Sequence, residues 1–282
     1  MEAKLVRSSN PELLVHSWRE SEGRLNPPVF IPKSYVTKAS KGLKVIRSGK
    51  NKEISFYGGS HREGAITVYG DLKHDDMRAV AVYALEFEEM LLRTLGGKPR
   101  NIPYYLRFYA DQGEFRKHAI HAGASNAMSF YDPRTRSIVM WFDKTLTHDD
   151  LQALVAHEFT HAYMDIVFDC VSPLWFAEGT AEYFQNFRWA GNHVEPGALN
   201  EVQLRILKLI GPTPFSDFVR MGRSDFYGGQ FKALYAQAWT VVHFLFEYEP
   251  EMIQDLLRRK QIDVDGLDGE WASHLQAMMK IA

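Results

Sequence analysis

Two histidines and a glutamate within five residues are the part of this sequence best suited to chemistry. The segment Leu151–Ile166 (LQALVAHEFTHAYMDI) contains His157, Glu158 and His161. Side chains four positions apart lie on one face of a helix, because each residue turns the chain by about 100°. Both imidazoles can then bind one metal ion, with Glu158 beside it as a general base. The alternative is an exposed helix on which these residues fall by chance.

A second motif supplies carboxylates. A catalytic zinc ion has three protein ligands and keeps one position for water. The segment Pro173–Phe184 (PLWFAEGTAEYF) predicts a helix with Glu178 and Glu182 one turn apart. Glu178 is the expected third ligand, since Gly179 beside it lets the two helices approach closely. Glu182 would accept the ring N–H of a ligating histidine. If both glutamates were surface residues, the aromatic residues around them would face water too.

Together, HEFTH and PLWFAEGTAEYF resemble the gluzincin metallopeptidases, the group that includes thermolysin and aminopeptidase N. The match is closest to the bacterial peptidase-MA-like domains and extends over residues 54–260. It implies one Zn²⁺ per chain, bound by His157, His161 and Glu178. It also implies that Glu158 is the catalytic base and that Glu182 occupies the acidic position four residues after the third ligand.

Two further segments resemble parts of the same family. FYDPRTRSIVMWF is similar to the strand pair before the zinc helix, which implies that an edge strand binds an extended substrate. The residues of that strand are Ile138, Val139, Met140 and Trp141. YAQAWTVVHFL resembles the helix that carries a transition-state tyrosine in the aminopeptidase N family, which implies this role for Tyr235. Tyr235 also adjoins an apolar stripe that would pack in the core, and Tyr227 in the FYGG segment is the alternative donor.

The sequence departs from the aminopeptidase N pattern in two places. Sixteen residues, 162 to 177, separate the second histidine of the motif from Glu178, which is a shorter link. Gly123–Met128 (GASNAM) is only a faint echo of the GAMEN motif that binds a free amine. A free N-terminus is therefore not an indicated substrate feature.

The pattern of the remaining residues predicts an α+β protein. In the first half, β-rich pieces of Ile54–Tyr69 around a GGS turn indicate a hairpin, and Asp71–Leu95 has helical spacing. A strand at Ile102–Tyr109, a polar connection over Gln112–Asn126 and a second hairpin over Met128–Phe142 follow. The second half predicts helices at about 149–168, 174–189, 198–210, 214–221, 228–248, 250–260 and 268–280.

These elements suggest a thermolysin-like zincin. Residues 1–50 would form an N-terminal extension, and 51–147 a subdomain with a small mixed or antiparallel sheet and the substrate-binding edge strand. Residues 148–282 would form a mostly helical subdomain that carries the zinc site. The active-site cleft is expected between these two subdomains.

Composition excludes several classes of protein. The 282 residues are 45% hydrophobic and 24% charged with a net charge of -2, so the chain is globular and has no general basic field for nucleic acid. No apolar stretch reaches the length of a membrane span. Cys170 is the single cysteine and cannot form an internal disulfide. Without a signal-peptide pattern, the expected location is cytoplasmic, although trimming of the chain would hide an export signal.

The other histidines and acidic residues give little indication of function. His118 and His121 are expected to be exposed, Asp263–Glu270 fails the EF-hand pattern, and His243 and His274 are expected to be ordinary core or surface residues. The leading hypothesis is a zinc-dependent peptidase acting on a peptide or protein substrate. The alternatives are a catalytically silent zinc-binding domain that binds a partner peptide, and a helical interaction protein without metal. Retention of the base beside the ligands favours catalysis.

Overall fold

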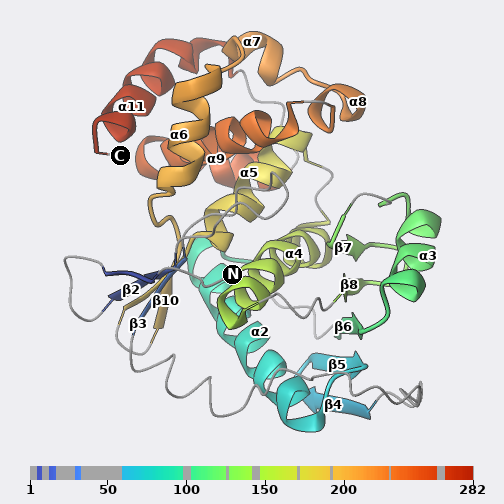
Figure 1. Ribbon diagram of the computed structural model, residues 1–282. Helices are drawn as coiled ribbons and strands as arrows, with labels where there is room; N and C mark the ends of the chain where they lie inside the picture. Colours follow the sequence, from blue (N-terminus) through green and yellow to red (C-terminus); the bar gives the residue numbers. More distant parts are fainter. Residues whose placement is uncertain are drawn as a thin grey trace. The chain divides into compact units, whose positions relative to one another are not determined.

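The computed structural model describes residues 5–7, 13–16, 29–32, 59–97, 103–124, 127–141, 147–169, 172–190, 193–228, 230–258 and 264–281 (Figure 1). Contacts divide the chain into two compact units. The first, called the sheet unit, is Lys33–Val167. The second, called the helical unit, combines Met1–Pro32 with Phe168–Ala282.

A five-stranded mixed sheet forms the centre of the sheet unit (Figure 1). Its strands are β4 (Gly59–Glu63), β5 (Ile66–Gly70), β6 (Tyr104–Tyr109), β7 (Ser129–Asp132) and β8 (Ser137–Trp141). The strand order is β4-β5-β6-β8-β7. The two central pairs, β5–β6 and β6–β8, are parallel, whereas the outer pairs, β4–β5 and β7–β8, are antiparallel.

Helices cover both faces of this sheet. They are α2 (His74–Leu95), α3 (Gln112–Ala122) and α4 (His148–Phe168). The ring of Tyr104 on β6 packs on Phe159 of α4, with centroids 4.6 Å apart. Because side chains alternate along a strand, Tyr109 on β6 points to the opposite face, where it meets Phe115 of α3. The sheet therefore lies between α4 on one face and α3 on the other.

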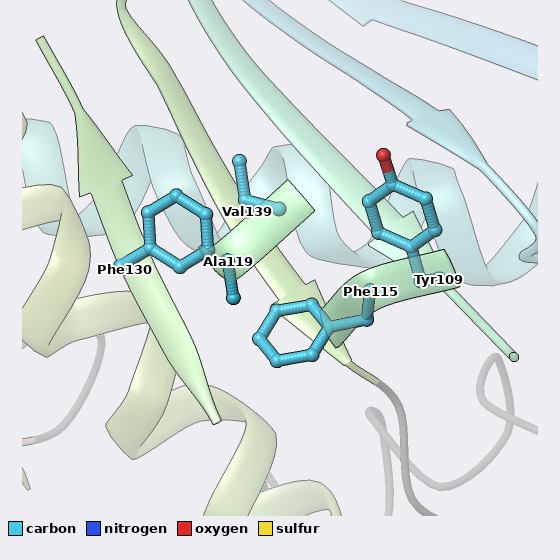
Figure 2. Close-up of a cluster of buried hydrophobic side chains, with 5 residues drawn as sticks. All are labelled: Tyr109, Phe115, Ala119, Phe130 and Val139. Carbon is cyan, nitrogen blue, oxygen red and sulfur yellow. The ribbon is translucent and has the colours of Figure 1, made fainter. Parts of the chain in front are cut away.

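The contact between α3 and the sheet is a compact cluster of buried side chains (Figure 2). Its members are Tyr109, Phe115, Ala119, Phe130 and Val139. Phe130 of β7 and Val139 of β8 are direct partners in the antiparallel register, so they present their side chains to the same face. This cluster fixes which face of β7 points toward α3.

The α3 helix corrects the prediction of a polar connection over residues 112–126. Asp111 caps the helix by accepting a hydrogen bond from the backbone N–H of Glu114 at 2.8 Å, and Gly123 ends it in the left-handed region. Within the helix, Phe115 and Ala119 are buried. Two buried residues on one face are enough for packing but leave a weak apolar pattern. His118 is half-buried, not exposed as expected, and its Nδ1 lies 3.0 Å from the Tyr109 hydroxyl.

The first hairpin exists, but its turn is not the predicted GGS segment. Gly59 and Ser60 lie within β4, and the chain reverses at Gly64, whose φ of 56° suits a glycine. The predicted β-rich piece 54–57 lies outside the described residues. The second hairpin, expected over Met128–Phe142, is confirmed, since β7 and β8 pair antiparallel within it.

The edge position predicted for Ile138–Trp141 is wrong. These residues belong to β8, which pairs with β6 on one side and β7 on the other. Ile138, Val139 and Met140 are buried. In the described sheet, β7 is the edge strand at this end. Strand order depends on long-range pairing, so a hairpin read from local pattern does not reveal which of its two strands is outside.

The helical unit contains most of the remaining elements. Its helices are α5 (Leu174–Gln185), α6 (Glu201–Ile210), α7 (Phe215–Phe218), α8 (Arg223–Phe226), α9 (Phe231–Tyr248), α10 (Pro250–Leu257), the 3₁₀ turn η1 (Asp265–Leu267) and α11 (Asp268–Ile281). Its strands are β1 (Leu5–Arg7), β2 (Leu13–His16), β3 (Val29–Pro32), β9 (Arg188–Ala190) and β10 (His193–Glu195). The predicted helix 174–189 is too long, because the chain leaves α5 after Gln185 and enters the β9–β10 hairpin.

The close packing that Gly179 was expected to permit is with α9. A Cβ atom built on Gly179 would lie 2.4 Å from the backbone oxygen of Ala238 on α9. No side chain can fit there without moving a helix, so glycine is required for this approach of α5 to α9.

The prediction of an α+β chain with a mostly helical remainder is confirmed. Contacts group α4 with the sheet, whereas the sequence pattern predicted that it belongs with the later helices. The reason is the apolar face of α4, which packs on the strands. Within the described parts of the chain, no helix has the length and apolarity needed to cross a membrane.

Candidate metal centre

Helix α4, which carries His157, Glu158 and His161, is capped at its first turn and buried along one face. Its first turn is a capping box, in which the Asp150 N–H donates to the Thr147 hydroxyl at 3.3 Å and the Asp150 carboxylate accepts from the Thr147 N–H at 2.5 Å. Burial raises the pKa of Asp150 to about 7 despite these hydrogen bonds. Further along, one face is fully buried: Leu151, Val155, Phe159 and Ala162.

The two histidines of α4 are spaced as ligands of one ion would be. Nε2 of His157 lies 3.3 Å from Nε2 of His161, with the ring planes at 74°. Two nitrogens bound to zinc at 2.0–2.1 Å in a tetrahedral arrangement lie about 3.4 Å apart. Both side chains are half-buried. The pair therefore has the separation of a chelate.

Glu178 on α5 completes the set of three donors. One ligand atom from each of His157, His161 and Glu178 lies within 4.8 Å of the others, and Glu178 is buried. Two imidazole nitrogens and one carboxylate oxygen form the donor set of several catalytic zinc sites. The residues thus fit a metal ion, and the predicted ligands are brought together.

Two tyrosines adjoin the Glu178 carboxylate. The Tyr227 hydroxyl, just after α8, donates to Glu178 Oε1 at 2.5 Å. Tyr235 on α9 is half-buried, and its ring centroid lies 6.4 Å from that of Tyr227. Burial first, and then the negative charge of Glu178, raise the pKa of both phenols well above the usual value. Both therefore stay protonated as hydrogen-bond donors.

The predicted base, Glu158, is buried and has a partner that sequence reasoning missed. The Ser129 hydroxyl on β7 donates to Glu158 Oε1 at 2.8 Å, and Ser129 is itself buried. The one available signal was a serine beside aromatic residues in a predicted strand. That signal does not say what the serine faces.

Glu182 lies in a buried polar network within the helical unit. Gln203 on α6 donates to Glu182 Oε2 through its side-chain amide at 2.5 Å. Asn200 accepts from the Gln203 backbone N–H and donates to the Asn186 side chain. Sequence reasoning missed this network, because its members come from separate segments. The predicted hydrogen bond between Glu182 and a ligating histidine stays a prediction.

Comparison with models of known protein families found no match for this chain, and comparison with curated proteins found none either. The chemistry of the site must therefore be argued from its residues.

Proposed function

We propose that this chain is a zinc-dependent peptidase with a gluzincin-type, thermolysin-like active site. One observation carries the proposal: the donor atoms of His157, His161 and Glu178 lie within 4.8 Å of one another, and a buried carboxylate, Glu158, follows the first ligand directly. These are the residues that the family resemblance names.

Zinc bound by these ligands would lower the pKa of a bound water to about 7 and polarise the substrate carbonyl. Glu158 accepts the proton of the attacking water and then donates it to the leaving amine. Its buried position keeps competing water away from this proton transfer. General acid–base catalysis of this kind contributes about 10²- to 10⁴-fold to the rate.

Tyr227 and Tyr235 are the candidate donors to the negative charge that develops on the substrate oxygen. Their raised pKa values keep both phenols neutral, so either can donate a hydrogen bond over the whole physiological pH range. Tyr227 follows a short helix and donates to Glu178. Tyr235 is anchored within α9.

An extended peptide is the expected substrate, and the strand it would pair with is β7 and not β8. Both sides of β8 already pair with neighbouring strands. In the described sheet, β7 pairs with β8 on one side, so its other side can accept a substrate strand by backbone hydrogen bonds. The hydroxyl of Ser129 links this strand to Glu158, which brings the binding edge close to the base.

Metal content and turnover together test the proposal. Purified wild type, Glu178→Ala and Glu158→Gln are analysed for zinc by elemental mass spectrometry and assayed on a pool of internally quenched peptides. Glu251→Gln, which changes an exposed glutamate of α10, is the matched control.

We expect about one zinc per chain in the wild type, loss of zinc in Glu178→Ala, and retention of zinc with about 10²- to 10⁴-fold slower turnover in Glu158→Gln. A wild type that binds no zinc after reconstitution contradicts the proposal. Bound zinc without cleavage would favour the silent domain that binds a partner peptide.

A further inference from the structure

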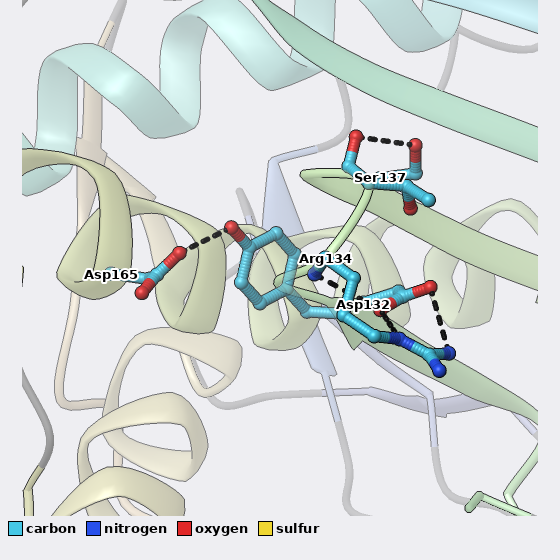
Figure 3. Close-up of polar contacts among 6 residues, drawn as sticks. Asp132, Arg134, Ser137 and Asp165 are labelled. Atoms are coloured by element: carbon cyan, nitrogen blue, oxygen red, sulfur yellow. Dashed lines mark hydrogen bonds and ion pairs between the residues drawn. The ribbon is translucent and has the colours of Figure 1, made fainter. Parts of the chain in front are cut away.

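Strand β7 is attached to helix α4 by two side-chain hydrogen bonds. The first joins the Ser129 hydroxyl to Glu158 Oε1 at 2.8 Å. The second joins the Tyr131 hydroxyl to Asp165 Oδ2 at 2.6 Å, and a dashed line at Asp165 marks this bond in Figure 3. Both lie within the sheet unit.

The spacing of these bonds follows from the geometry of the two elements. Ser129 and Tyr131 are two residues apart, so they point to the same face of the strand. Glu158 and Asp165 are seven residues apart, or two helical turns, so they lie on the same face of α4. The long tyrosine side chain spans the greater separation along the helix.

The residue between them fixes the direction of the serine. Phe130 points to the opposite face of the sheet, where it lies in the buried cluster with Phe115 of α3 (Figure 2). Its ring also contacts that of His118 on α3. A rotation that moved Ser129 away from α4 would also pull Phe130 out of this cluster. The fold therefore holds the hydroxyl toward Glu158.

A glutamate needs such a constraint to act as a base. Its terminal torsion is broad and roughly two-fold, so backbone and packing alone do not fix the direction of the carboxylate oxygens. A hydroxyl that donates to Oε1 restricts that torsion, and a hydrogen bond to a charged acceptor is about twice as strong as one between neutral groups. The bond at Oε1 leaves Oε2 for the proton of the water.

We propose that Ser129 is the positioning residue of Glu158: it holds the carboxylate in the orientation that proton transfer requires. This inference rests on the proposed function, in which Glu158 is the base. It differs from a purely structural role, because the Tyr131 bond to Asp165 already attaches the strand to the helix.

Three variants of the full chain test the proposal. Ser129→Ala removes the hydroxyl, and Ser129→Thr retains it with a side chain that suits a strand. Tyr163→Phe is the matched control, because it removes a different hydroxyl from α4, one that donates to the Gly96 carbonyl at 2.8 Å. Each is compared with the wild type in zinc content, thermal stability, crystal structure, affinity of the zinc-loaded protein for acetohydroxamate, and kcat and KM on the quenched peptides.

We expect Ser129→Ala to bind zinc as the wild type does, while its Glu158 carboxylate occupies more than one orientation in the crystal. Binding of acetohydroxamate needs a proton acceptor beside the metal, so the affinity of this variant for acetohydroxamate should fall about tenfold. Turnover should fall about tenfold in kcat with KM unchanged. Ser129→Thr should restore all three properties. Tyr163→Phe should lose thermal stability alone.

A single, wild-type orientation of Glu158 in Ser129→Ala overturns the proposal, and so does unchanged acetohydroxamate affinity in the zinc-loaded variant. A fall in thermal stability without either change would reduce Ser129 to a structural contact. Failure of the proposed function is recognised separately, since it shows as absent zinc or absent turnover in the wild type. The orientation of Glu158 in the crystals decides the role of Ser129 in that case as well.

Discussion

Two pairs of histidines in the described part of the chain have almost the same spacing and different surroundings. His157 and His161 on α4 have their Nε2 atoms 3.3 Å apart. His243 on α9 and His274 on α11 have Nδ1 and Nε2 3.2 Å apart. The distance between the nitrogens therefore does not separate a candidate chelate from a pair of packed side chains.

What differs is the third group. A carboxylate, Glu178, lies within 4.8 Å of the first pair. Aromatic rings surround the second pair: Tyr183, Trp239, Phe244 and Tyr248. Burial is the main cause that lowers the pKa of both His243 and His274, so these imidazoles are favoured in the neutral form. The comparison teaches that a close pair of imidazoles becomes a candidate metal site only where a carboxylate oxygen lies within ligand distance of both nitrogens.

The largest expected effect is on zinc binding, and it separates the two pairs directly. His161→Ala removes one of three ligands, so we expect zinc affinity to fall by about a thousandfold. His274→Ala removes the equivalent member of the second pair and should leave zinc affinity unchanged. Competition with a chromophoric chelator measures both. Equal losses in the two variants would mean that the second pair also supports the metal.

The next largest effect is on stability. It concerns the packing of α5, which carries Glu178, against α9, which carries His243. Gly179→Ala would place a Cβ against the Ala238 carbonyl of α9, and we expect the free energy of unfolding to fall by about 3 kcal/mol. Gly269→Ala is the control, because its added Cβ meets nothing within 4 Å and lies in α11. Urea unfolding followed by circular dichroism measures both. A neutral result for Gly179→Ala would show that α5 and α9 can move apart freely.

Sequence reasoning identified the local part of the candidate metal centre. The spacing of His157 and His161 is a property of one helix, and α4 forms where its apolar pattern predicts it. Glu178 was found because a catalytic zinc needs a third ligand and a buried helix offered one. The roles of Tyr227 and Tyr235 could not be separated from sequence, and the structure places both beside Glu178.

The parts that sequence reasoning missed depend on contacts between distant segments. Ser129 meets Glu158 across 29 residues, and Gln203 meets Glu182 across 21. The order of strands in the sheet, which makes β7 the edge and not β8, is likewise a long-range property. Helix α3 was missed for a different reason, since its cap and its glycine stop were present but its apolar face was narrow.

A smaller effect concerns Glu182, the second carboxylate of α5. If Glu182 orients a ligating histidine, Glu182→Gln should lower zinc affinity about tenfold, because it removes the charge and keeps the size. Asn200→Ala breaks the same polar network two hydrogen bonds away, so it should lower stability by about 1 kcal/mol and leave zinc affinity unchanged. Unchanged affinity in Glu182→Gln would restrict this glutamate to the packing of α5 on α6.

The smallest effect is a pH dependence that belongs to the second pair alone. The folded-state pKa values of His243 and His274 lie below the ordinary value of 6.5, and Glu247 opposes this shift only in part. Below pH 6.5 the unfolded chain binds protons that the folded chain does not, so this pair should lower stability as the pH falls from about 7 towards 5. Asp150 acts in the opposite direction, because its raised pKa of about 7 favours its protonated, folded form as the pH falls.

The two contributions are separated by a variant. His274→Gln keeps a hydrogen-bonding side chain that does not titrate, so the loss of stability between pH 7 and 5 should be smaller than in the wild type. Zinc must be removed with a chelator first, because metal affinity is itself pH-dependent and a bound metal would add to the stability of the folded chain. Urea midpoints at the two pH values measure the difference. The same slope in the wild type and in His274→Gln would mean that the second pair accepts protons in the folded state as readily as in the unfolded chain.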